Sequence, residues 1–336
     1  MLLFLWFVLC TQSTPSRGPL VTCDNVHELR FLSAEPFAHG ETKRVFRATF
    51  RDAPVVVAQP NQQQHGHDDP LAYFLQERAR LQSFVDRGCG DLVTTHLGGC
   101  LVPSEPPVAV YELLRGFIDA ALDLRTTWPQ RLKMAIGSID LLRLMDGAVY
   151  ADLFAGQLCV NRDLKVKLVD MESFIPLPQG RLGSNQSCSA NADCELLFWR
   201  HWQALRGLRR LQLDDFECGE NRFCNGVDSA SVLAAMCHVV IEPLFLVARE
   251  HIPRALLAAV LGVLDRCVTR QRSDRALPDD IRRAFEALLP TEPIPQLELE
   301  NSNAGFQIRK EIFDAVRRDA ALRYEFARQK PTHYGR

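Results

Sequence analysis

The segment from Tyr150 to Phe174 constrains the fold more than any other part of the chain. It carries two aspartates, Asp152 and Asp170, which lie 18 residues apart on either side of a polar turn and an alternating apolar strand. We expect three short strands here, at 149–150, 158–160 and 164–169. The two aspartates either shape turns, which is the common use of aspartate in loops, or carry chemistry.

The first 114 residues favour a β-rich region with one helix. The expected strands are a hairpin with a glycine turn at 37–50, and further strands at 55–58, 91–101 and 108–114. We expect a turn at 52–54, because proline and aspartate occur together there. Apolar residues recur at helical spacing over 71–84, which leaves Glu77 able to project from one face of that helix.

The pattern turns helical after Gly116. Thr127 is a suitable N-cap and Pro129 fits the first turn of a helix that we expect to end at Gly147. Further helices are expected at 196–211, 229–247, 253–268 and 278–289, followed by a charged helix at 307–328. This second part of the chain is therefore mostly helical.

The N-terminus has the features of a secretory signal peptide. Residues 1–8 are apolar without interruption, and small residues suit cleavage after Ser13. The alternative is that this run is part of a membrane anchor. It is about half as long as the roughly 20 residues that a spanning helix needs, and we expect no other stretch to supply such a span.

Cysteine content agrees with export. The chain has 11 cysteines, and losing Cys10 with the signal peptide leaves ten, an even number that favours disulfides without fixing their pairing. Asn185-Gln186-Ser187 is an acceptor sequence for N-glycosylation in that compartment. The formal net charge of −2 argues against nucleic acid as the main partner.

Phosphoryl transfer needs three kinds of group, and the chain offers a candidate for each. One carboxylate orients the attacking hydroxyl, a second holds the metal on the nucleotide, and a lysine fixed by a glutamate clamps the phosphates. The candidates occur in the order in which protein kinases carry them, and several segments resemble kinase motifs. The segment from Gly40 to Phe46 resembles the glycine loop and second strand, and Glu112 to Leu114 resembles the hinge that binds adenine.

The same resemblance implies roles for single residues. Glu77 resembles the glutamate of the kinase helix C, which pairs with the phosphate-clamping lysine. Tyr150-Ala151-Asp152 stands in place of the H-R-D motif and implies that Asp152 is the catalytic base. Val169-Asp170-Met171 stands in place of the D-F-G motif and implies that Asp170 binds magnesium.

The chain also departs from the usual kinase pattern. Ala58 occupies the place of the strand-three lysine, and Lys43 on the preceding strand is the natural substitute. This resembles the with-no-lysine kinases and protein O-mannose kinase. Gln157 replaces the metal-binding asparagine, as in the secreted lonesome tyrosine kinase of vertebrates, whose cysteine pattern is similar to the pairs Cys188–Cys194 and Cys218–Cys224. The divergent protein-kinase-domain family of the secretory pathway has comparable cysteines.

The resemblance implies an α+β, bilobal, protein-kinase-like fold with a small antiparallel N-lobe and a larger helical C-lobe. The expected segments are a signal peptide at 1–13, the N-lobe at 24–114, the C-lobe with a cysteine-bearing insert at 115–300, and a charged helix or tail at 301–336. The implied substrates are ATP with Mg²⁺ or Mn²⁺ and a hydroxyl on a secreted or luminal protein or its glycan. Two alternatives stay open: a pseudokinase that binds nucleotide or partners, and a disulfide-stapled module that binds a glycan or receptor.

Overall fold

The computed structural model divides the chain into two compact units. Unit 1 comprises Met1–Leu114 with Lys167–Glu172, and unit 2 comprises Arg115–Val166 with Ser173–Arg336. The residues that the structure describes are 20–39, 43–61, 70–102, 107–145, 148–150, 153, 155–171, 174–176, 184–194, 215, 217–269, 272–297 and 315. The expected signal peptide and, apart from Ala315, the expected helix at 307–328 lie outside them. The chain is α+β, with an antiparallel sheet and helices.

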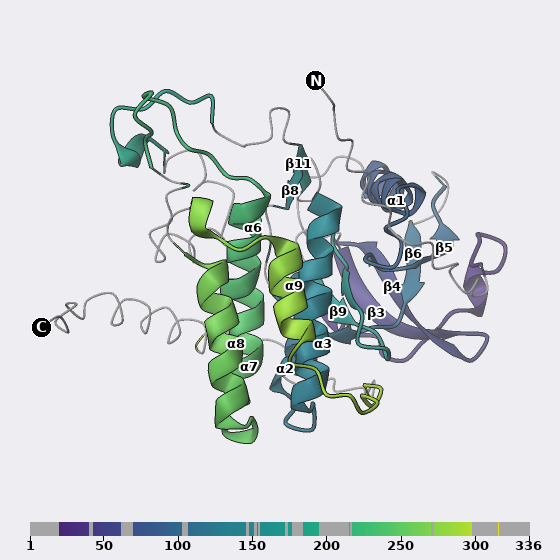
Figure 1. Ribbon diagram of the computed structural model, residues 1–336. Helices are drawn as coiled ribbons and strands as arrows, with labels where there is room; N and C mark the ends of the chain where they lie inside the picture. The colour runs from purple at the N-terminus through teal and green to yellow at the C-terminus, as the bar shows by residue number, and fades with distance from the viewer. Residues whose placement is uncertain are drawn as a thin grey trace, which may run out of the picture. The chain divides into compact units, whose positions relative to one another are not determined.

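Unit 1 is built on an antiparallel sheet (Figure 1). Its described strands lie in the order β1 (Arg30–Phe31), β3 (Lys43–Phe50), β4 (Ala53–Pro60), β6 (Val108–Glu112) and β5 (His96–Cys100), and β2 (Ala38–His39) also pairs with β3. The hairpin expected at 37–50 is confirmed by the β2–β3 pairing. Lys43 lies at the start of β3, opposite Pro60 of β4.

Two local predictions for unit 1 need correction. The turn before β4 is formed by Arg51 and Asp52, both at positive φ (49° and 64°), so β4 begins at Ala53, inside the turn expected at 52–54. Positive φ at both central residues matches the twist of a two-residue hairpin. The strand expected at 91–101 shortens to β5, because Leu92 and Thr94 instead exchange backbone hydrogen bonds with Leu168, far away in the sequence.

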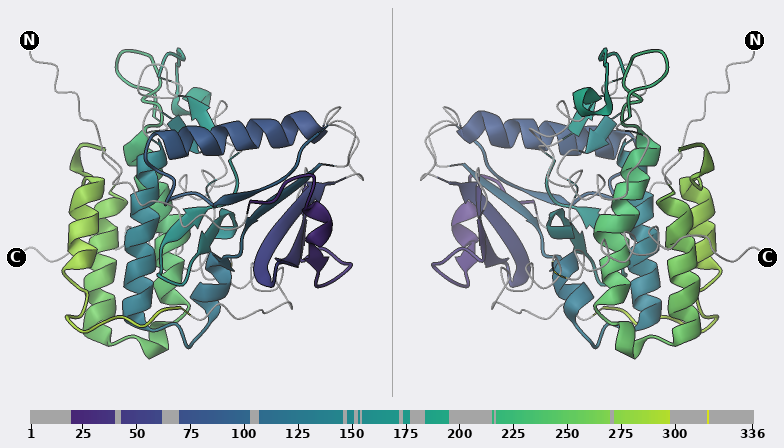
Figure 2. Two further views of the ribbon diagram at one scale, coloured as in Figure 1. Left: turned by 90° about the vertical axis from the view of Figure 1, so that its right-hand side faces the viewer. Right: turned by 90° about the vertical axis from the view of Figure 1, so that its left-hand side faces the viewer.

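The helix α1 (Pro70–Asp86) packs on one face of this sheet (Figure 2). Its buried side chains, Phe74, Glu77, Leu81 and Phe84, recur at spacings of three and four residues, which places them on one side of the helix. Glu77 is therefore part of the inward stripe, although the other three members are apolar. The helix expected at 71–84 is confirmed, extended by a few residues at its ends.

The opposite face of the sheet is covered by the N-terminal segment. Val21 and the alternating residues Phe46, Ala48 and Phe50 of β3 form a buried cluster with valines of β4 and β6. Gly98 (φ 117°) lets the backbone of Val21 approach, since a Cβ at this position would lie 2.0 Å from the Val21 carbonyl oxygen. The Cys23–Cys100 disulfide also ties this segment to Cys100, the last residue of β5.

Unit 2 is mostly helical. Its described helices include α2 (Phe117–Leu122), α3 (Trp128–Asp140), α6 (Ser229–Met236), α7 (Glu242–Leu246), α8 (Arg254–Cys267) and α9 (Pro278–Glu286). Its strands are β7 (Arg115–Gly116), which pairs with β9 (Leu158–Val160), and β8 (Ala148–Tyr150), which pairs with β11 (Phe174–Pro176). Short 3₁₀ helices lie at Leu141–Met145 (η2), Ala155–Gln157 (η3), Arg249–His251 (η6) and Arg272–Asp274 (η7), and η1 at Val26–Glu28 belongs to unit 1.

Helix α3 begins at its predicted N-cap and ends before its predicted limit. The Gln130 side chain accepts a hydrogen bond of 2.8 Å from the Thr127 N–H, so the expected N-cap is confirmed. The helix gives way to η2 at Leu141, before the expected end at Gly147, which lies outside the described residues. A tighter 3₁₀ turn is a common helix ending because it satisfies terminal carbonyl groups.

The run from Ser229 to Leu246 forms the centre of unit 2. It joins α6 to α7 through a π-helical turn, η5 (Cys237–Ile241), and the Cys237–Cys267 disulfide ties this turn to α8. This run is long and apolar enough to cross a membrane, although we expected no stretch beyond the N-terminal one to be so. However, 89% of it is buried inside the protein, as in a core helix.

A buried arginine organises the packing beside this run. Arg131 of α3 is 1% exposed and donates hydrogen bonds to the carbonyl oxygens of Ala121, Asp123, Thr126 and Leu244. Burial lowers the pKa of its guanidinium to about 10. It remains charged at neutral pH and satisfies carbonyl groups where the chain leaves α2 and α7.

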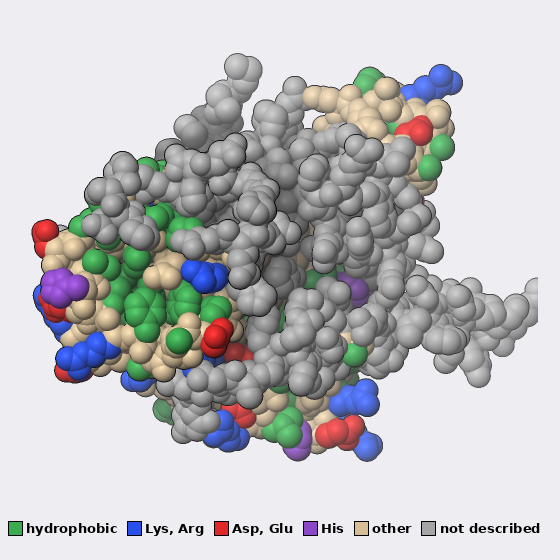
Figure 3. All heavy atoms as spheres, turned by 180° about the vertical axis from the view of Figure 1, so that it is seen from behind, with side chains coloured by type: hydrophobic (Ala, Val, Ile, Leu, Met, Phe, Trp, Pro, Cys, Tyr) green, Lys and Arg blue, Asp and Glu red, His purple; other side chains and the backbone are tan. Residues whose placement is uncertain are grey.

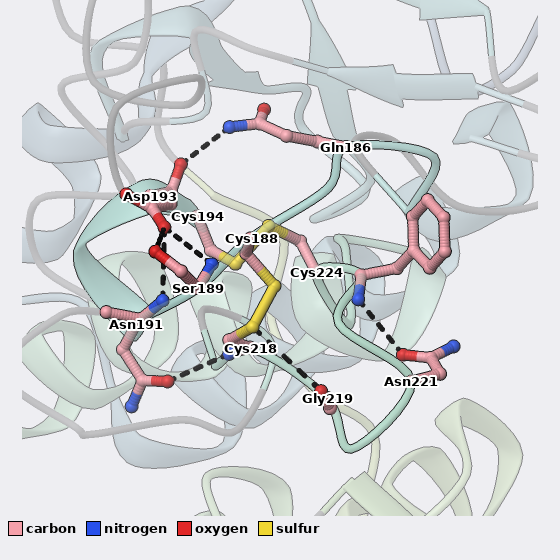
Figure 4. The surroundings of a disulfide bond; sticks show 12 residues. Gln186, Cys188, Ser189, Asn191, Asp193, Cys194, Cys218, Gly219, Asn221 and Cys224 are labelled. Carbon is pink, nitrogen blue, oxygen red and sulfur yellow. Dashed lines mark hydrogen bonds between the residues drawn. A yellow bond between two sulfur atoms is a disulfide. The ribbon is translucent and has the colours of Figure 1, made fainter.

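The cysteine-bearing part of unit 2 is a two-disulfide cluster (Figure 4). Cys188 pairs with Cys218 and Cys194 with Cys224, so each bond joins the two C-x5-C segments instead of closing one of them. The Asp193 carboxylate accepts hydrogen bonds from the backbone and hydroxyl of Ser189. Four described disulfides confirm the expected disulfide bonding and are typical of oxidising secretory or extracellular compartments.

Some apolar side chains of unit 1 remain on its surface. Figure 3 shows hydrophobic side chains gathered among charged ones on the face seen from behind. Phe31 and Phe37 are 44% and 39% exposed; Phe31 packs edge-on against Phe46, and the Arg47 guanidinium lies 4.9 Å from the centre of the Phe37 ring. These contacts cover part of each ring within the unit.

Candidate functional site

The candidate site in unit 1 is built around an ion pair between the sheet and α1. The Lys43 Nζ lies 2.9 Å from Oε1 of Glu77, and the two side chains are 16% and 2% exposed. Ala58 is buried on β4 opposite Val45, two residues along β3 from Lys43 and on the same face of the sheet. Lys43 therefore reaches the α1 face from the strand beside the one that carries Ala58.

Tyr111 completes the environment of Glu77. This residue of β6 is 8% exposed, and its hydroxyl donates a hydrogen bond of 3.2 Å to Oε2 of Glu77. The two oxygens of the buried carboxylate thus have separate donors, Lys43 and Tyr111. A buried carboxylate needs such partners, because an unpaired one would be strongly destabilising.

The charges in this group favour a protonated lysine. Burial on its own lowers the pKa of Lys43, but the negative charges of Glu77 and Asp170 outweigh it, and the net direction is upward. Burial, followed by the charge of Glu77, raises the pKa of the Tyr111 hydroxyl. At neutral pH the group therefore combines a fixed cation, a neutral phenol and the carboxylate of Glu77.

The strand that leads to Asp170 is held by a second ion pair. Lys167 of β10 (Val166–Leu168) donates to the Glu112 carboxylate and, at 3.3 Å, to the Thr95 hydroxyl. Glu112 Oε1 also accepts a hydrogen bond of 2.7 Å from the Thr95 N–H. Leu168 adds a parallel bridge to Val93. Lys167 is thereby fixed to Glu112 and Thr95, and Leu168 to Val93, just before Asp170 in the sequence.

The residue after Asp170 has its own anchor on α1. Nη1 of Arg80 donates a hydrogen bond of 2.7 Å to the carbonyl oxygen of Met171, which is fully buried. Arg80 follows Glu77 by three residues, so the two side chains leave the same side of the helix. A single helix thus contacts both Lys43 and the Asp170–Met171 segment.

His96 lines the other side of Tyr111. Its ring packs edge-on against the Tyr111 ring, with centroids 5.3 Å apart. Burial and then the positive charge of Arg78 lower the pKa of His96 to about 4, so the imidazole is neutral at neutral pH. It contributes packing and no charge beside the Glu77 pair.

The predicted site residues fall into four groups. The structure brings Lys43 and Glu77 into contact and places Asp170 where its charge acts on Lys43. The side chain of Glu112 is engaged by Lys167, and Leu114 is the last residue of the first segment of the same unit. Gln157 is half-buried in η3 of unit 2. Gly40 and Asp152 lie outside the described residues.

Sequence reasoning missed Tyr111 as a partner of Glu77, and it missed Arg80 and Lys167 altogether. A signal existed for Lys167, because it interrupts an apolar strand whose three residues are all buried, and a buried lysine requires a partner. Arg80 lies one turn beyond Glu77, but its acceptor is a backbone carbonyl 91 residues away along the chain. No periodic pattern identifies such a pair.

The chemistry of the group suits an anionic ligand with a divalent cation. The Lys43 ammonium donates to Glu77, and a lysine held by a carboxylate is the kind of group that clamps phosphates. The Asp170 carboxylate is the type of oxygen ligand that Mg²⁺ prefers. By contrast, the close sulfur atoms of Cys188, Cys194 and Cys224 are committed to disulfides, which removes them as metal ligands.

Comparison with known proteins gives no assignment. No protein-family model matches the chain, and no curated protein matches its sequence at a significant level.

Proposed function

We propose that the chain is a secretory-pathway or extracellular kinase with a bilobal, protein-kinase-like fold. It transfers the γ-phosphate of ATP to a hydroxyl of a secreted protein or of its glycan. The observation that carries this proposal is the 2.9 Å ion pair between Lys43 and Glu77, which lies within the electrostatic reach of Asp170. Buried lysine–glutamate pairs beside a metal-binding aspartate are what a phosphate clamp requires.

The candidate site residues of unit 1 have separate parts in nucleotide binding. Lys43, held by Glu77, contacts the phosphates, and Asp170 holds Mg²⁺ or Mn²⁺. The backbone of Glu112 and Leu114 contacts adenine, and Gly40 allows the chain to approach the phosphates closely. By resemblance to the metal-binding asparagine of kinases, Gln157 is the candidate for a further amide ligand. A divalent cation held there would neutralise charge that develops on the phosphates.

The transfer itself needs one more carboxylate. Asp152 orients the acceptor hydroxyl and takes its proton while the oxygen attacks the γ-phosphorus. The bond between that oxygen and phosphorus forms, the bond from phosphorus to the bridging oxygen of ADP breaks, and ADP leaves. The role of Asp152 rests on its place in the sequence, 18 residues before Asp170.

The disulfides support the proposed location. Such bonds are typical of oxidising compartments, which include the secretory pathway and the cell exterior. Asn185 of the glycosylation acceptor sequence is exposed, and Ser187 two residues later is exposed as well. Their exposure supports a glycan at Asn185, since a glycan attaches at the surface.

Transfer of label from γ-labelled ATP tests the proposal. The wild-type protein is expected to label a secreted protein or glycan in the presence of Mg²⁺. Asp170→Asn is expected to reduce the rate by about 100-fold or more, because a charged group that stabilises the transition state is lost. Asp86→Asn is the matched control: Asp86 is exposed at the end of α1 and accepts a hydrogen bond from Gln82, which asparagine also accepts.

Two other results would instead support one of the two alternative functions. Binding of Mg·ATP without transfer to any protein or glycan acceptor identifies a pseudokinase. Absence of both binding and transfer leaves the disulfide-stapled binding module, whose rigid part is the cluster of Cys188 to Cys224.

A further inference from the structure

Arg80 has a contact that the proposed roles leave unexplained. Its guanidinium donates to the carbonyl oxygen of Met171, the residue that immediately follows Asp170. Holding an arginine in one conformation is costly, because its long side chain loses much rotamer freedom. A charge-assisted hydrogen bond of 2.7 Å is, however, stronger than one between neutral groups.

The backbone around Asp170 is anchored on both sides. Before it, the N–H of Leu168 donates to the Leu92 carbonyl, and the Leu168 carbonyl accepts from Thr94, each at 3.0 Å. After it, the described anchor is the Arg80–Met171 bond. Asp170 itself lies between these points and is half-buried. The direction of its carboxylate therefore depends on the positions of the two neighbouring anchors.

The downstream anchor comes from the same helix as Glu77. Arg80 and Glu77 are three residues apart in α1, and they contact segments from different parts of the sequence, Met171 and Lys43. Any shift of α1 relative to the sheet would change both contacts at once. The helix thus links the position of the phosphate-clamping lysine to that of the metal-binding aspartate.

We propose that Arg80 is a positioning residue that sets the geometry of Asp170 for divalent metal. The inference rests on the proposed function, because it takes Asp170 as the metal ligand. In this proposal Arg80 acts on Asp170 through the Met171 carbonyl. Its removal is therefore expected to weaken metal use more than it weakens the fold.

The test is the Mg²⁺ concentration that gives half-maximal thermal stabilisation at saturating ATP. Arg80→Met is expected to raise this concentration about tenfold, the size of effect expected for one charged hydrogen bond. Arg80→Lys keeps a charged donor on a slightly shorter side chain, and it is expected to recover most of the loss. Arg78→Met, at an exposed position of the same helix, is the matched control and is expected to behave as wild type.

The melting temperature without ligand separates positioning from structure. Lowered melting with unchanged Mg²⁺ dependence in Arg80→Met would overturn the inference and leave Arg80 a purely structural residue. Failure of Arg80→Lys to recover Mg²⁺ dependence in a folded protein would also overturn it. If Arg80→Met does not fold, Arg80→Gln, with a shorter neutral donor, takes its place. If wild type itself shows no stabilisation by Mg·ATP, the proposed function fails and the inference fails with it.

Discussion

Replacement of Lys43 by methionine is expected to reduce phosphate transfer by about 100-fold to 1,000-fold, the loss seen when a preorganised donor to transition-state charge is removed. The expectation depends on the position of Lys43, whose ammonium is 2.9 Å from Glu77 and feels the charge of Asp170. Methionine has similar length and no charge, so packing against α1 is largely kept. Initial rates of label transfer at saturating ATP measure the effect.

The same substitution is expected to destabilise unit 1. Glu77 is 3% exposed, and loss of Lys43 leaves a buried carboxylate with Tyr111 as its remaining described donor. Breaking a buried ion pair at one partner costs about 3 kcal/mol. The double variant Lys43→Met with Glu77→Gln removes that buried charge, so it is expected to regain stability while staying inactive.

A matched substitution separates these effects from a general change in charge. Lys133 is an exposed lysine of α3, and Lys133→Met is expected to match wild type in both rate and stability. Transfer by Lys43→Met within a few-fold of wild type would contradict the assignment. In that event Lys167 would be the next lysine to test, because it lies three residues before Asp170.

Loss of the Cys23–Cys100 disulfide is expected to lower the stability of unit 1 by about 4 kcal/mol, because the bond closes a long loop. The two cysteines are separated by 77 residues, and the bond fastens the segment that covers the apolar face of the sheet. A loss of this size is a large part of the stability of an ordinary domain. The double variant Cys23→Ala with Cys100→Ala leaves no unpaired thiol at either position.

Hydrogen exchange read on peptides of unit 1 measures this change. The control is Cys237→Ala with Cys267→Ala, which opens a loop of 30 residues and is read on peptides of unit 2. Because the cost of loop closure grows with loop length, the control loss is expected to be somewhat smaller. Unchanged exchange in unit 1 after removal of Cys23 and Cys100 would show that the segment is held by its packing alone.

Local patterns predicted the secondary structure where one face of an element is buried. The helix at 71–84 was recoverable from Phe74, Leu81 and Phe84, because burial of one side imposes helical spacing. The predicted turn was misplaced by a residue or two. Arg51 and Asp52 both have positive φ, but neither is glycine, the residue type that readily adopts it, so the sequence did not indicate this turn. The strand at 91–101 was too long because Leu92 and Thr94 pair with a segment more than 70 residues away.

The contacts of the candidate site were likewise predictable only in part. Lys43 and Glu77 were accessible through the order of motifs, and the structure puts them in contact. The bonds of Tyr111 to Glu77, Lys167 to Glu112 and Arg80 to Met171 join residues 34, 55 and 91 positions apart. Such contacts depend on how elements pack in three dimensions. The crossed pairing of Cys188 and Cys194 with Cys218 and Cys224 was hidden for the same reason.

The most direct test of the account is thermal unfolding of the wild-type protein with ATP alone, Mg²⁺ alone and both together. A ligand that binds only the folded state stabilises it, by about 2.7 kcal/mol when present at 100 times its Kd. Clear stabilisation by ATP with Mg²⁺ is expected, and it is expected to be lost in Asp170→Asn and kept in Asp86→Asn. No stabilisation of wild type by Mg·ATP, or stabilisation that is unchanged in Asp170→Asn, would contradict it.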